Sequence, residues 1–327
     1  MAVETRTLQL TQAQRRASER VNSLLAAMPR LSMDGLSLAW GQRLNRPVSA
    51  AFGRFSEYAL HRSGAVVAET VIRTASGALR LRRLIPPGAP RALVLDFHGG
   101  GWVVGSAALN DRVNRHLLAA GYAVASVDYR LLDESGTTRL ADAVADCEAA
   151  IRWALEVTAS PLFIVGESAG AHLACLGLLA LSAGERAGVA GCVFVQGVFD
   201  LAGTPSVRQA GPDALLFDGP NLVRDLARVT PELDEAGRRS ADVSPLYADL
   251  AEVPPALFIV GECDPLRDDG RMMSEAWGGS STLIEVPTAP HGFQHLGAPT
   301  AALAQAEIRA WLEDRLQARL SVDEMTR

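Results

Sequence analysis

From residue 65 onward, short apolar runs alternate with longer segments whose apolar positions recur every three or four residues. The short runs are typical of buried strands, and the longer segments are typical of amphipathic helices. The pattern predicts strands at 65–73, 79–85, 91–97, 122–128, 161–165, 189–195, 255–260 and 282–286. It predicts helices at 110–120, 138–157, 169–181, 266–277 and 300–320. Alternating strands and helices are joined by parallel crossovers, so we expect an α/β fold, with a hairpin of the first two strands at one edge.

Two segments break this alternation. Residues 1–60 are helical in pattern, with a second amphipathic stretch that Pro47 is expected to end. Residues 200–244 carry no strand signal and are too long for an ordinary connection, so an insertion over the top of the sheet fits them better. We therefore divide the chain into an α/β unit, residues 61–199 and 245–327, and two covering segments.

Composition limits the classes of function. The chain has 327 residues, of which 48% are hydrophobic, so it can bury a sizeable core. Its net charge of −6 gives no electrostatic argument for binding nucleic acid. All 31 basic residues are Arg, which excludes a Lys nucleophile, a Schiff base and the Lys of a phosphate-binding loop.

The cysteines and the N-terminus bear on the cellular compartment. Cys147, Cys175, Cys192 and Cys263 lack the paired spacing of a metal site and lie in apolar or helical contexts, so we expect buried free thiols. The first residues lack the layout of a signal peptide, and no apolar run is long enough to span a bilayer. These features predict a cytoplasmic protein without a membrane span and without a metal.

One stretch organises the candidate chemistry. The apolar run 162–165 leads into Gly-Glu-Ser-Ala-Gly at 166–170, and a segment rich in Ala and Leu follows. This order predicts a strand, a tight turn and a helix, with Ser168 on the turn and glycines where larger side chains would clash. Gly-x-Ser-x-Gly alone is a weak signal, because a purely structural turn between a strand and a helix gives the same pattern.

The sequence also supplies a base and an acid for this serine. A serine hydroxyl needs a base to accept its proton, and the base needs an acid to orient it. Asp264 and His291 each follow a predicted strand, in the chain order Ser, acid, His that belongs to this type of turn. Each has an alternative role. Asp264 could cap a helix and His291 could be an ordinary loop residue, with Asp268 and His295 as the rival acid and base.

A run of three glycines follows another predicted strand, in His-Gly-Gly-Gly-Trp at residues 98–102. The bare amides of such a run can turn towards one point and stabilise the oxyanion of a tetrahedral intermediate. The donors that we assign are the amides of Gly100, Gly101 and Ala169. We expect His98, with Gly99, to support the loop rather than to act as a second base. A glycine run can instead bind phosphate, but no Gly-Lys-Ser/Thr follows it here.

Four further side chains lie close to these groups in the sequence. Glu167 precedes the candidate nucleophile, and we expect it to bond the loop backbone and fix the turn. His172 lies one turn into the helix and is expected to be packed. Trp102 and Phe293 are candidates for the walls of an acyl pocket, although a plain core role fits each of them equally well.

Four motifs together resemble the hormone-sensitive lipase family of α/β-hydrolases, in its bacterial carboxylesterase branch. They are His-Gly-Gly-Gly-Trp at 98–102, Gly-Glu-Ser-Ala-Gly-Ala at 166–171, Asp-Pro-Leu-Arg-Asp at 264–268 and His-Gly-Phe at 291–293. The resemblance runs from about residue 91 to the C-terminus. It implies an α/β-hydrolase fold and hydrolysis of carboxylic esters through an acyl-serine intermediate, without metal or cofactor. It also implies a helical cap built from residues 1–60 and 200–244.

The chain departs from the family pattern in three places. Glu167 stands where Asp is usual, Ala171 stands where Gly is frequent, and Leu-Asp-Glu at 132–134 replaces Ala-Pro-Glu. These departures leave the triad intact. The stretch around Ser168 also resembles the formamidase-like hydrolases, which keeps amide substrates open.

We therefore expect an esterase acting on short acyl esters of small alcohols or phenols, with a small-molecule ester as its partner and a homodimer as a compatible assembly. One alternative is an amidase or deacetylase of a small biosynthetic metabolite. The other is a catalytically silent hydrolase fold that binds a ligand. Silent members usually lack a triad residue, and Ser168, Asp264 and His291 are all present here, so we rank that alternative last.

Overall fold

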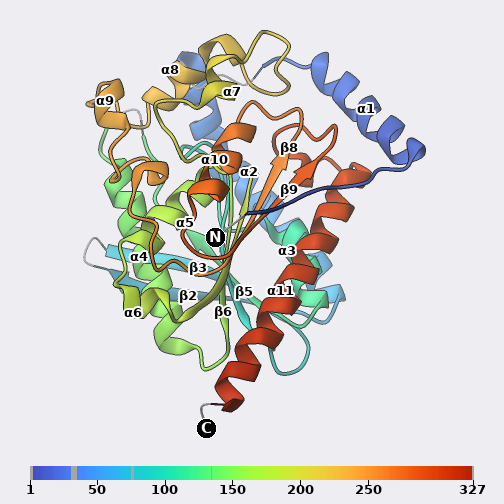
Figure 1. Ribbon diagram of the computed structural model, residues 1–327, viewed down its shortest axis with the longest axis vertical. Helices are drawn as coiled ribbons and strands as arrows, with labels where there is room; N and C mark the ends of the chain where they lie inside the picture. Colours follow the sequence, from blue (N-terminus) through green and yellow to red (C-terminus); the bar gives the residue numbers. More distant parts are fainter. Residues whose placement is uncertain (1–2, 31–34, 75–76, 134, 326–327) are drawn as a thin grey trace.

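A nine-stranded sheet forms the centre of the molecule, with helices on both faces (Figure 1). The computed structural model describes residues 3–30, 35–74, 77–133 and 135–325. The strand order is β1-β9-β8-β7-β6-β4-β5-β3-β2. The β2–β3 and β3–β5 pairings are antiparallel, and the other pairings among these strands are parallel. The predicted α/β fold with a hairpin at one edge is therefore confirmed.

The eight strands predicted from the sequence are present, with their ends moved by a few residues, and β1 is an additional strand. The strands are β1 (Glu4–Thr7), β2 (Val66–Thr74), β3 (Gly77–Ile85), β4 (Leu93–Phe97), β5 (Ala123–Asp128), β6 (Leu162–Glu167), β7 (Val189–Val195), β8 (Ala256–Gly261) and β9 (Ser281–Val286). The longer helices are α1 (Gln12–Ala26), α2 (Gly35–Arg62), α3 (Asp111–Ala119), α4 (Leu140–Val157), α5 (Ala169–Leu179), α10 (Arg267–Ala276) and α11 (Pro299–Met325). The short ones are α6 (Ala183–Arg186), α7 (Pro205–Arg208), η1 (Gly219–Asn221), α8 (Leu222–Ala227), α9 (Glu235–Arg238), η2 (Pro245–Tyr247) and η3 (Phe293–His295).

The sheet is buried on both faces, which explains why its parallel strands have continuous apolar runs rather than alternating ones. One face packs against α4, α5 and α10. The aromatic rings that meet on this face are those of Phe194, Phe199, Phe258 and Trp277. The opposite face packs against α3 and α11 and includes Phe163, Phe293 and Leu312. Burial of these two layers fixes the sheet, and therefore the strand ends that carry the candidate site.

The N-terminal segment differs from its prediction as a wholly helical unit. Residues Glu4–Thr7 form β1, which pairs in parallel with β9 and adds a strand to the sheet edge. Pro47 was expected to end a helix, but α2 continues through it to Arg62. Proline removes one hydrogen bond from the helix interior, and packing of the following turns, where Leu60 is buried, compensates for that loss.

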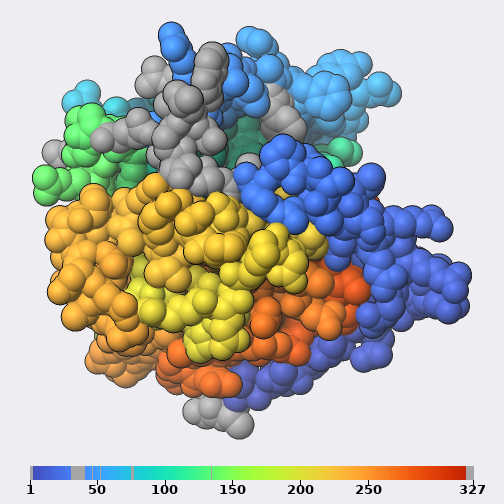
Figure 2. All heavy atoms as spheres, turned by 90° about the horizontal axis from the view of Figure 1, so that it is seen from above, coloured from blue at the N-terminus to red at the C-terminus, as the bar shows by residue number. Residues whose placement is uncertain are grey.

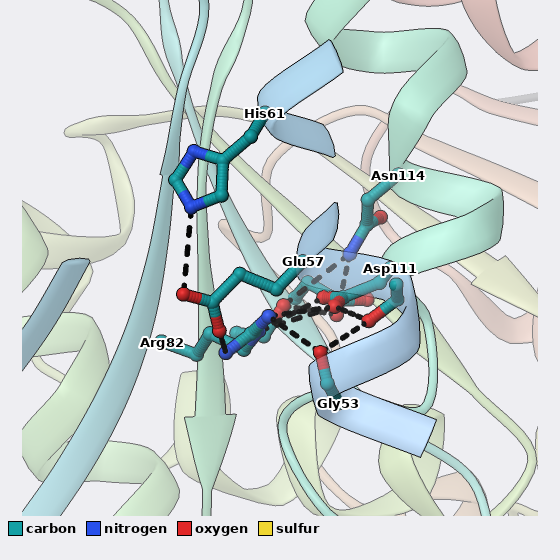
Figure 3. A network of polar contacts seen from close by, with 9 residues as sticks. Gly53, Glu57, His61, Arg82, Asp111 and Asn114 are labelled. Atoms are coloured by element: carbon teal, nitrogen blue, oxygen red, sulfur yellow. Dashed lines mark hydrogen bonds and ion pairs between the residues drawn. The ribbon is translucent and has the colours of Figure 1, made fainter. Parts of the chain in front are cut away.

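A polar network fixes the second half of α2 to the α/β unit (Figure 3). Asp111, at the start of α3, accepts hydrogen bonds from Ser56 of α2 and from Arg82 of β3. Arg82 also donates to the carbonyl of Gly53 and lies 3.7 Å from Glu57. The side chain of Asp111 is 0% exposed. A buried carboxylate requires such partners, so three elements distant in sequence are tied together at this point.

The 200–244 segment, with α7, α8 and α9, lies above the end of the sheet to which β8 and β9 point (Figure 1). It contains short helices joined by turns, and its first residues are held by the buried carboxylate of Asp269, which accepts from the amides of Phe199 and Asp200. Figure 2 shows this yellow-to-orange segment beside the blue N-terminal helices on the upper face of the molecule.

Three of the four cysteines are buried, and the described helices include no membrane span. Cys147, Cys175 and Cys192 are buried free thiols, whereas Cys263 is a free thiol that is exposed, contrary to the prediction. Cys263 lies after the end of β8, between Glu262 and Asp264, where the chain turns towards solvent. The apolar residues of the strand therefore do not cover it. Among the described helices, none combines the length and the apolar character needed to cross a bilayer.

Candidate active site

Ser168 occupies the turn between β6 and α5, in a backbone conformation that is rare for a residue with a side chain (φ 53°, ψ −122°). The glycines on either side make this turn feasible. A Cβ on Gly170 would lie 2.1 Å from the carbonyl oxygen of Phe97, and one on Gly166 would lie 2.6 Å from Ala171 Cα. The turn therefore presents the hydroxyl at the edge of the sheet, and the geometry is that expected of a nucleophile elbow.

The candidate base and acid lie in line with this hydroxyl. His291 Nε2 is 2.9 Å from Ser168 Oγ, and His291 Nδ1 is 2.9 Å from Asp264 Oδ2. Asp264 is completely buried, while His291 is 8% exposed and Ser168 9% exposed. The Asp264 carboxylate accepts a hydrogen bond from the Nδ1–H group of His291, and the Nε2 lone pair is then directed at the serine hydroxyl. Three side chains from three separate loops thus form one continuous relay.

Both rival residues lie outside this relay. Asp268, in the first turn of α10, forms an ion pair with Arg271 at 3.3 Å. His295 Nε2 lies 2.8 Å from Glu167 Oε2. Glu167 was expected to bond the loop backbone, and its carboxylate instead pairs with this histidine. The structure therefore brings together Ser168, Asp264 and His291, and gives each rival another partner.

Gln196, which the sequence reasoning missed, braces the acid and the base at once. Its amide nitrogen donates to Asp264 Oδ2 at 2.6 Å and to the Pro290 carbonyl at 2.9 Å. Its amide oxygen accepts from the Gly292 backbone at 2.8 Å. Gln196 directly follows β7, so the rule that singled out Asp264, a polar residue at the carboxyl end of a parallel strand, would also have found it.

The glycine loop after β4 lies against the nucleophile turn. A Cβ on Gly99 would lie 3.5 Å from Ser168 Cβ, so the two segments are in close contact. Gly100 and Gly101 both have positive φ, 123° and 57°, as does Trp102 at 64°. No described group accepts from the amides of Gly100, Gly101 or Ala169. These amides remain available to an oxyanion.

Contacts within the loop match the supporting role expected of His98. Its Nδ1 lies 2.7 Å from the Gly99 carbonyl, and its ring stacks on Tyr129 with centroids 4.2 Å apart. Tyr129 Oη donates to the His98 carbonyl at 2.6 Å. Burial lowers the pKa of His98, so the ring is neutral and donates through Nδ1. His98 therefore faces the loop rather than Ser168.

Helix α2 clamps the far end of the same loop, a link that the sequence did not reveal. The Asn45 side chain accepts from the Gly105 amide at 2.7 Å and donates to the Gly105 carbonyl at 2.9 Å. Gln42 donates to the Leu132 carbonyl, and Leu132 in turn donates to the Trp102 carbonyl. The N-terminal segment thus helps to hold the loop that carries two of the candidate oxyanion donors.

His172 is packed, as predicted, and connects three segments. Trp102 Nε1 donates to His172 Nδ1 at 3.1 Å, and His172 Nε2 lies 2.8 Å from the Val243 carbonyl. Burial lowers its pKa to about 4, so the ring is neutral and donates through Nε2. The chain Trp102–His172–Val243 links the glycine loop to the 200–244 segment through the core.

Comparison with known proteins identifies the family. Residues 94–295, which include every side chain of the relay, match the α/β-hydrolase fold family. The chain belongs to this α/β-hydrolase family. The resemblance that the four sequence motifs indicated is confirmed.

Relatives and solved structures agree with this assignment. Carboxylesterase NlhH of Mycobacterium tuberculosis is 33% identical over 65% of this chain and 70% of its own length. An ethyl acetate hydrolase of Pseudomonas putida is 33% identical over 64% of this chain and 69% of its own. The structure of an esterase from the archaeon Pyrobaculum calidifontis superimposes with a TM-score of 0.72 at 27% identity, and covers 93% of this α/β-hydrolase and 97% of that chain.

A pocket role and a core role were both open for two aromatic residues of the hydrolase. Trp102 is 2% exposed and Phe293 is 0% exposed, and their burial favours the core role for both. Another aromatic side chain, Phe217, lies next to the candidate base. It comes from the 200–244 segment, and its ring centroid lies 4.8 Å from that of His291. No local motif marks Phe217 in the sequence, because its place depends on how the insertion folds.

Electrostatics around His291 suit a general base. Burial lowers the pKa of the imidazole, but the charge of Asp264 and its hydrogen bond outweigh this effect, so the pKa of His291 is raised. The charge of Glu167 raises it further and that of His295 lowers it. The imidazole of the hydrolase is thus poised to accept a proton and to be stabilised once it has done so.

Proposed function

We propose that this α/β-hydrolase is a serine carboxylesterase in which Ser168 is the nucleophile, His291 the general base and Asp264 the acid that orients it. The observation that carries the proposal is the pair of 2.9 Å contacts that runs from Asp264 through His291 to Ser168. The esterase names of relatives at 33% identity support an ester as the bond that is cleaved.

The reaction follows from the geometry. Ser168 Oγ attacks the ester carbonyl carbon while His291 Nε2 accepts the hydroxyl proton. The amides of Gly100, Gly101 and Ala169 stabilise the oxyanion that forms. The bond to the leaving alcohol then breaks, and the alcohol takes the proton from His291. Water enters, His291 removes one of its protons, and the water oxygen attacks the acyl carbon to form a second tetrahedral intermediate. This intermediate collapses with cleavage of the bond to Ser168 Oγ, which takes the proton back from His291, and the carboxylic acid leaves.

We assign the cap to α1, α2 and the 200–244 segment, and β1 to the sheet. Three contacts support this division. The ring of Phe217 packs on that of His291. The Val243 carbonyl accepts a hydrogen bond from His172. Asn22 of α1 donates to the Thr288 carbonyl at 2.7 Å, close to the loop of His291. A cap in this place excludes water and limits the acyl chain. The preferred substrates are esters with acyl chains of roughly two to eight carbons, since each buried methylene contributes only about 0.8 kcal/mol before the pocket ends.

The test is Ser168→Ala together with labelling by a fluorophosphonate. Activity on p-nitrophenyl acetate should fall on the order of 10⁴-fold or more, because the base and the acid act only through the nucleophile. The probe should label the wild-type protein at Ser168 and leave the variant unlabelled. Substantial activity in a folded Ser168→Ala protein would refute the assignment.

A panel of p-nitrophenyl esters from acetate to palmitate, with matched anilides, then identifies the substrate class. Faster cleavage of the anilides would move the protein to the amidases. A flat profile across acyl lengths would count against the proposed cap.

A further inference from the structure

Glu167 and His295 form a second carboxylate–imidazole pair directly beside the reacting groups. Their contact measures 2.8 Å, and the side chain of Glu167 is 7% exposed and that of His295 29% exposed. The peptide bond joins Glu167 to Ser168, and His295 lies four residues after His291 at the end of η3. The reaction described above uses neither member of this pair.

Two side-chain contacts and two stretches of backbone close a ring that includes the nucleophile. His291 meets Ser168 at 2.9 Å, and His295 meets the residue before Ser168 at 2.8 Å. The backbone closes both remaining sides, from 167 to 168 and from 291 to 295. The loop of the base is therefore fixed to the loop of the nucleophile at two points, and Glu167–His295 is the point that takes no part in proton transfer.

The pKa shifts of the two members favour the charged form of each. The charge of Glu167 raises the pKa of His295, although burial and the charge of Arg112 oppose it, and Asp96 assists. Burial opposes ionisation of Glu167, but the charge and the hydrogen bond of His295 outweigh it and lower the pKa of Glu167. An ion pair so little exposed to water interacts strongly with its neighbours.

We propose that the Glu167–His295 pair positions His291 against Ser168 and keeps the net charge beside the catalytic imidazole close to zero. The inference rests on the proposed function, since it assigns a task to residues next to the proposed nucleophile and base. The charged groups that face His291 are Asp264, Glu167 and His295, and the ring that the insertion packs against it, Phe217, is neutral. Loss of His295 leaves the buried charge of Glu167 uncompensated, and that charge adds to the charge of Asp264.

Removing one member at a time should move the pH profile in opposite directions. In His295→Gln the unpaired Glu167 stabilises protonated His291, so the acid limb of kcat/KM moves to higher pH. Activity at pH 6, relative to the plateau, should fall roughly two- to fivefold below that of the wild type, and the plateau at pH 8.5 should itself be lower because the second tie between the two loops is lost. In Glu167→Gln the acid limb should move to lower pH. The charge of Glu167 raises the pKa of His291 more than the charge of His295 lowers it, and the substitution removes the charge of Glu167.

A matched control is available in His61→Gln. His61 pairs with Glu57 at 3.5 Å on α2, but this pair is exposed and does not contact the site. Its removal should leave the pH profile unchanged. A purely structural role for the Glu167–His295 pair would lower activity equally at all pH values in both variants, and that result would overturn the proposal.

A measurement on the wild-type protein covers the case in which a variant does not fold. In an NMR titration, His295 should hold its proton to higher pH than the exposed His116, whose pKa is lowered. A His295 that loses its proton at or below the pH at which His116 loses its own would overturn the proposal. Fluorophosphonate labelling separates the two failures. Loss of labelling at Ser168 in the wild type would reject the proposed function, whereas labelled variants with unmoved pH profiles would reject only the role of the pair.

Discussion

At the scale of single residues, the candidate site depends on side chains that follow strand ends. Asp264 receives two hydrogen bonds besides that of His291, from Gln196 Nε2 and from the Leu266 amide at 2.9 Å. These bonds satisfy a completely buried carboxylate and fix its orientation. Gln196 is the side chain that joins the acid to the loop of the base, so it is the residue whose loss should disturb the relay without removing any of its members.

Gln196→Leu should lower kcat roughly tenfold or more with little change in KM. Leucine fills much of the same space but cannot make the hydrogen bonds of Gln196 to Asp264 and to the Gly292 amide. The imidazole of His291 is then held less firmly. Steady-state kinetics on p-nitrophenyl acetate checks this. Gln317→Leu on α11, where the glutamine bonds only Glu313, is the control and should behave as the wild type. An unchanged kcat in Gln196→Leu would show that the brace is dispensable.

The pH dependence of kcat/KM should follow the titration of His291. Only the neutral imidazole accepts a proton, and the neighbouring Asp264 raises the pKa of His291 above its ordinary value. Activity should therefore increase with pH through a value above about 6.5 and then reach a plateau. A profile that is already flat from pH 5 upward would contradict this. EDTA should leave the profile unchanged, because no metal takes part in the proposed steps.

Sequence reasoning located the residues whose position follows from a strand end and a local motif. Ser168, Asp264 and His291 each follow a strand whose parallel direction could be predicted, so their meeting at one edge could be predicted as well. Gln196 obeys the same rule but belongs to no recognised motif. Phe217 and Asn45 could not be found, because their positions depend on how the insertion and α2 fold against the sheet.

At the scale of elements, α2 is the link between the covering segments and the chemistry. Pro47 was expected to end it, and a local rule failed because tertiary contacts on both sides of the proline hold the helix. Before Pro47, the Asn45 side chain forms hydrogen bonds with the backbone of Gly105. After Pro47, the Ser56 hydroxyl donates a hydrogen bond to Asp111. The predicted strands and the longer helices of the α/β unit agreed with the sequence within a few residues, since their pattern reflects burial that extends over whole elements.

Asn45→Ala should lower kcat several-fold while the protein remains folded. The substitution frees the Gly105 amide and carbonyl, and the loop that holds Gly100 and Gly101 loses its anchor on α2, so the oxyanion donors are less preorganised. The measurement is kcat for p-nitrophenyl acetate beside the melting temperature. Val48→Ala, at an exposed position on the same helix, is the matched control. Equal effects of the two substitutions would argue against a specific clamp.

Deleting the first 45 residues should blur the preference for short acyl chains and lower solubility. The deletion removes β1, α1 and the Asn45 clamp, and it exposes apolar surface around the site. The alternative is that these helices only stabilise the sheet. In that case the truncated enzyme would be less stable, but its acyl-length profile would match that of the full chain. Profiles on the p-nitrophenyl ester panel decide between these outcomes.

At the scale of the whole molecule, ion pairs differ greatly in their burial. A buried pair should therefore affect the free energy of unfolding much more than an exposed pair. Arg82 and Asp111 join β3 to α3 beneath α2, with side chains 18% and 0% exposed. Arg91 and Glu313 form a pair at 2.7 Å between the start of β4 and α11, but both side chains are about two-fifths exposed (42% and 41%). Water screens the second pair and not the first.

Arg82→Met should lower the free energy of unfolding by about 3 kcal/mol or more, because it leaves the buried Asp111 without its cation. Arg91→Met should change it by less than about 1 kcal/mol. Urea denaturation followed by circular dichroism measures both. Similar values for the two variants would mean that Asp111 finds another partner when Arg82 is absent.

The pairing of β1 with β9 has a consequence for biosynthesis. Thr7 and Glu285, which meet at this edge, are 278 residues apart in the chain. β1 is the first of the nine described strands and β9 is the last, so β1 has no partner in the sheet until β9 has been made. A chain that ends before β9 leaves β1 unpaired, and an unpaired strand edge can pair with other chains. Completion of this edge of the sheet therefore depends on synthesis of β9, the strand that leads into the loop of His291.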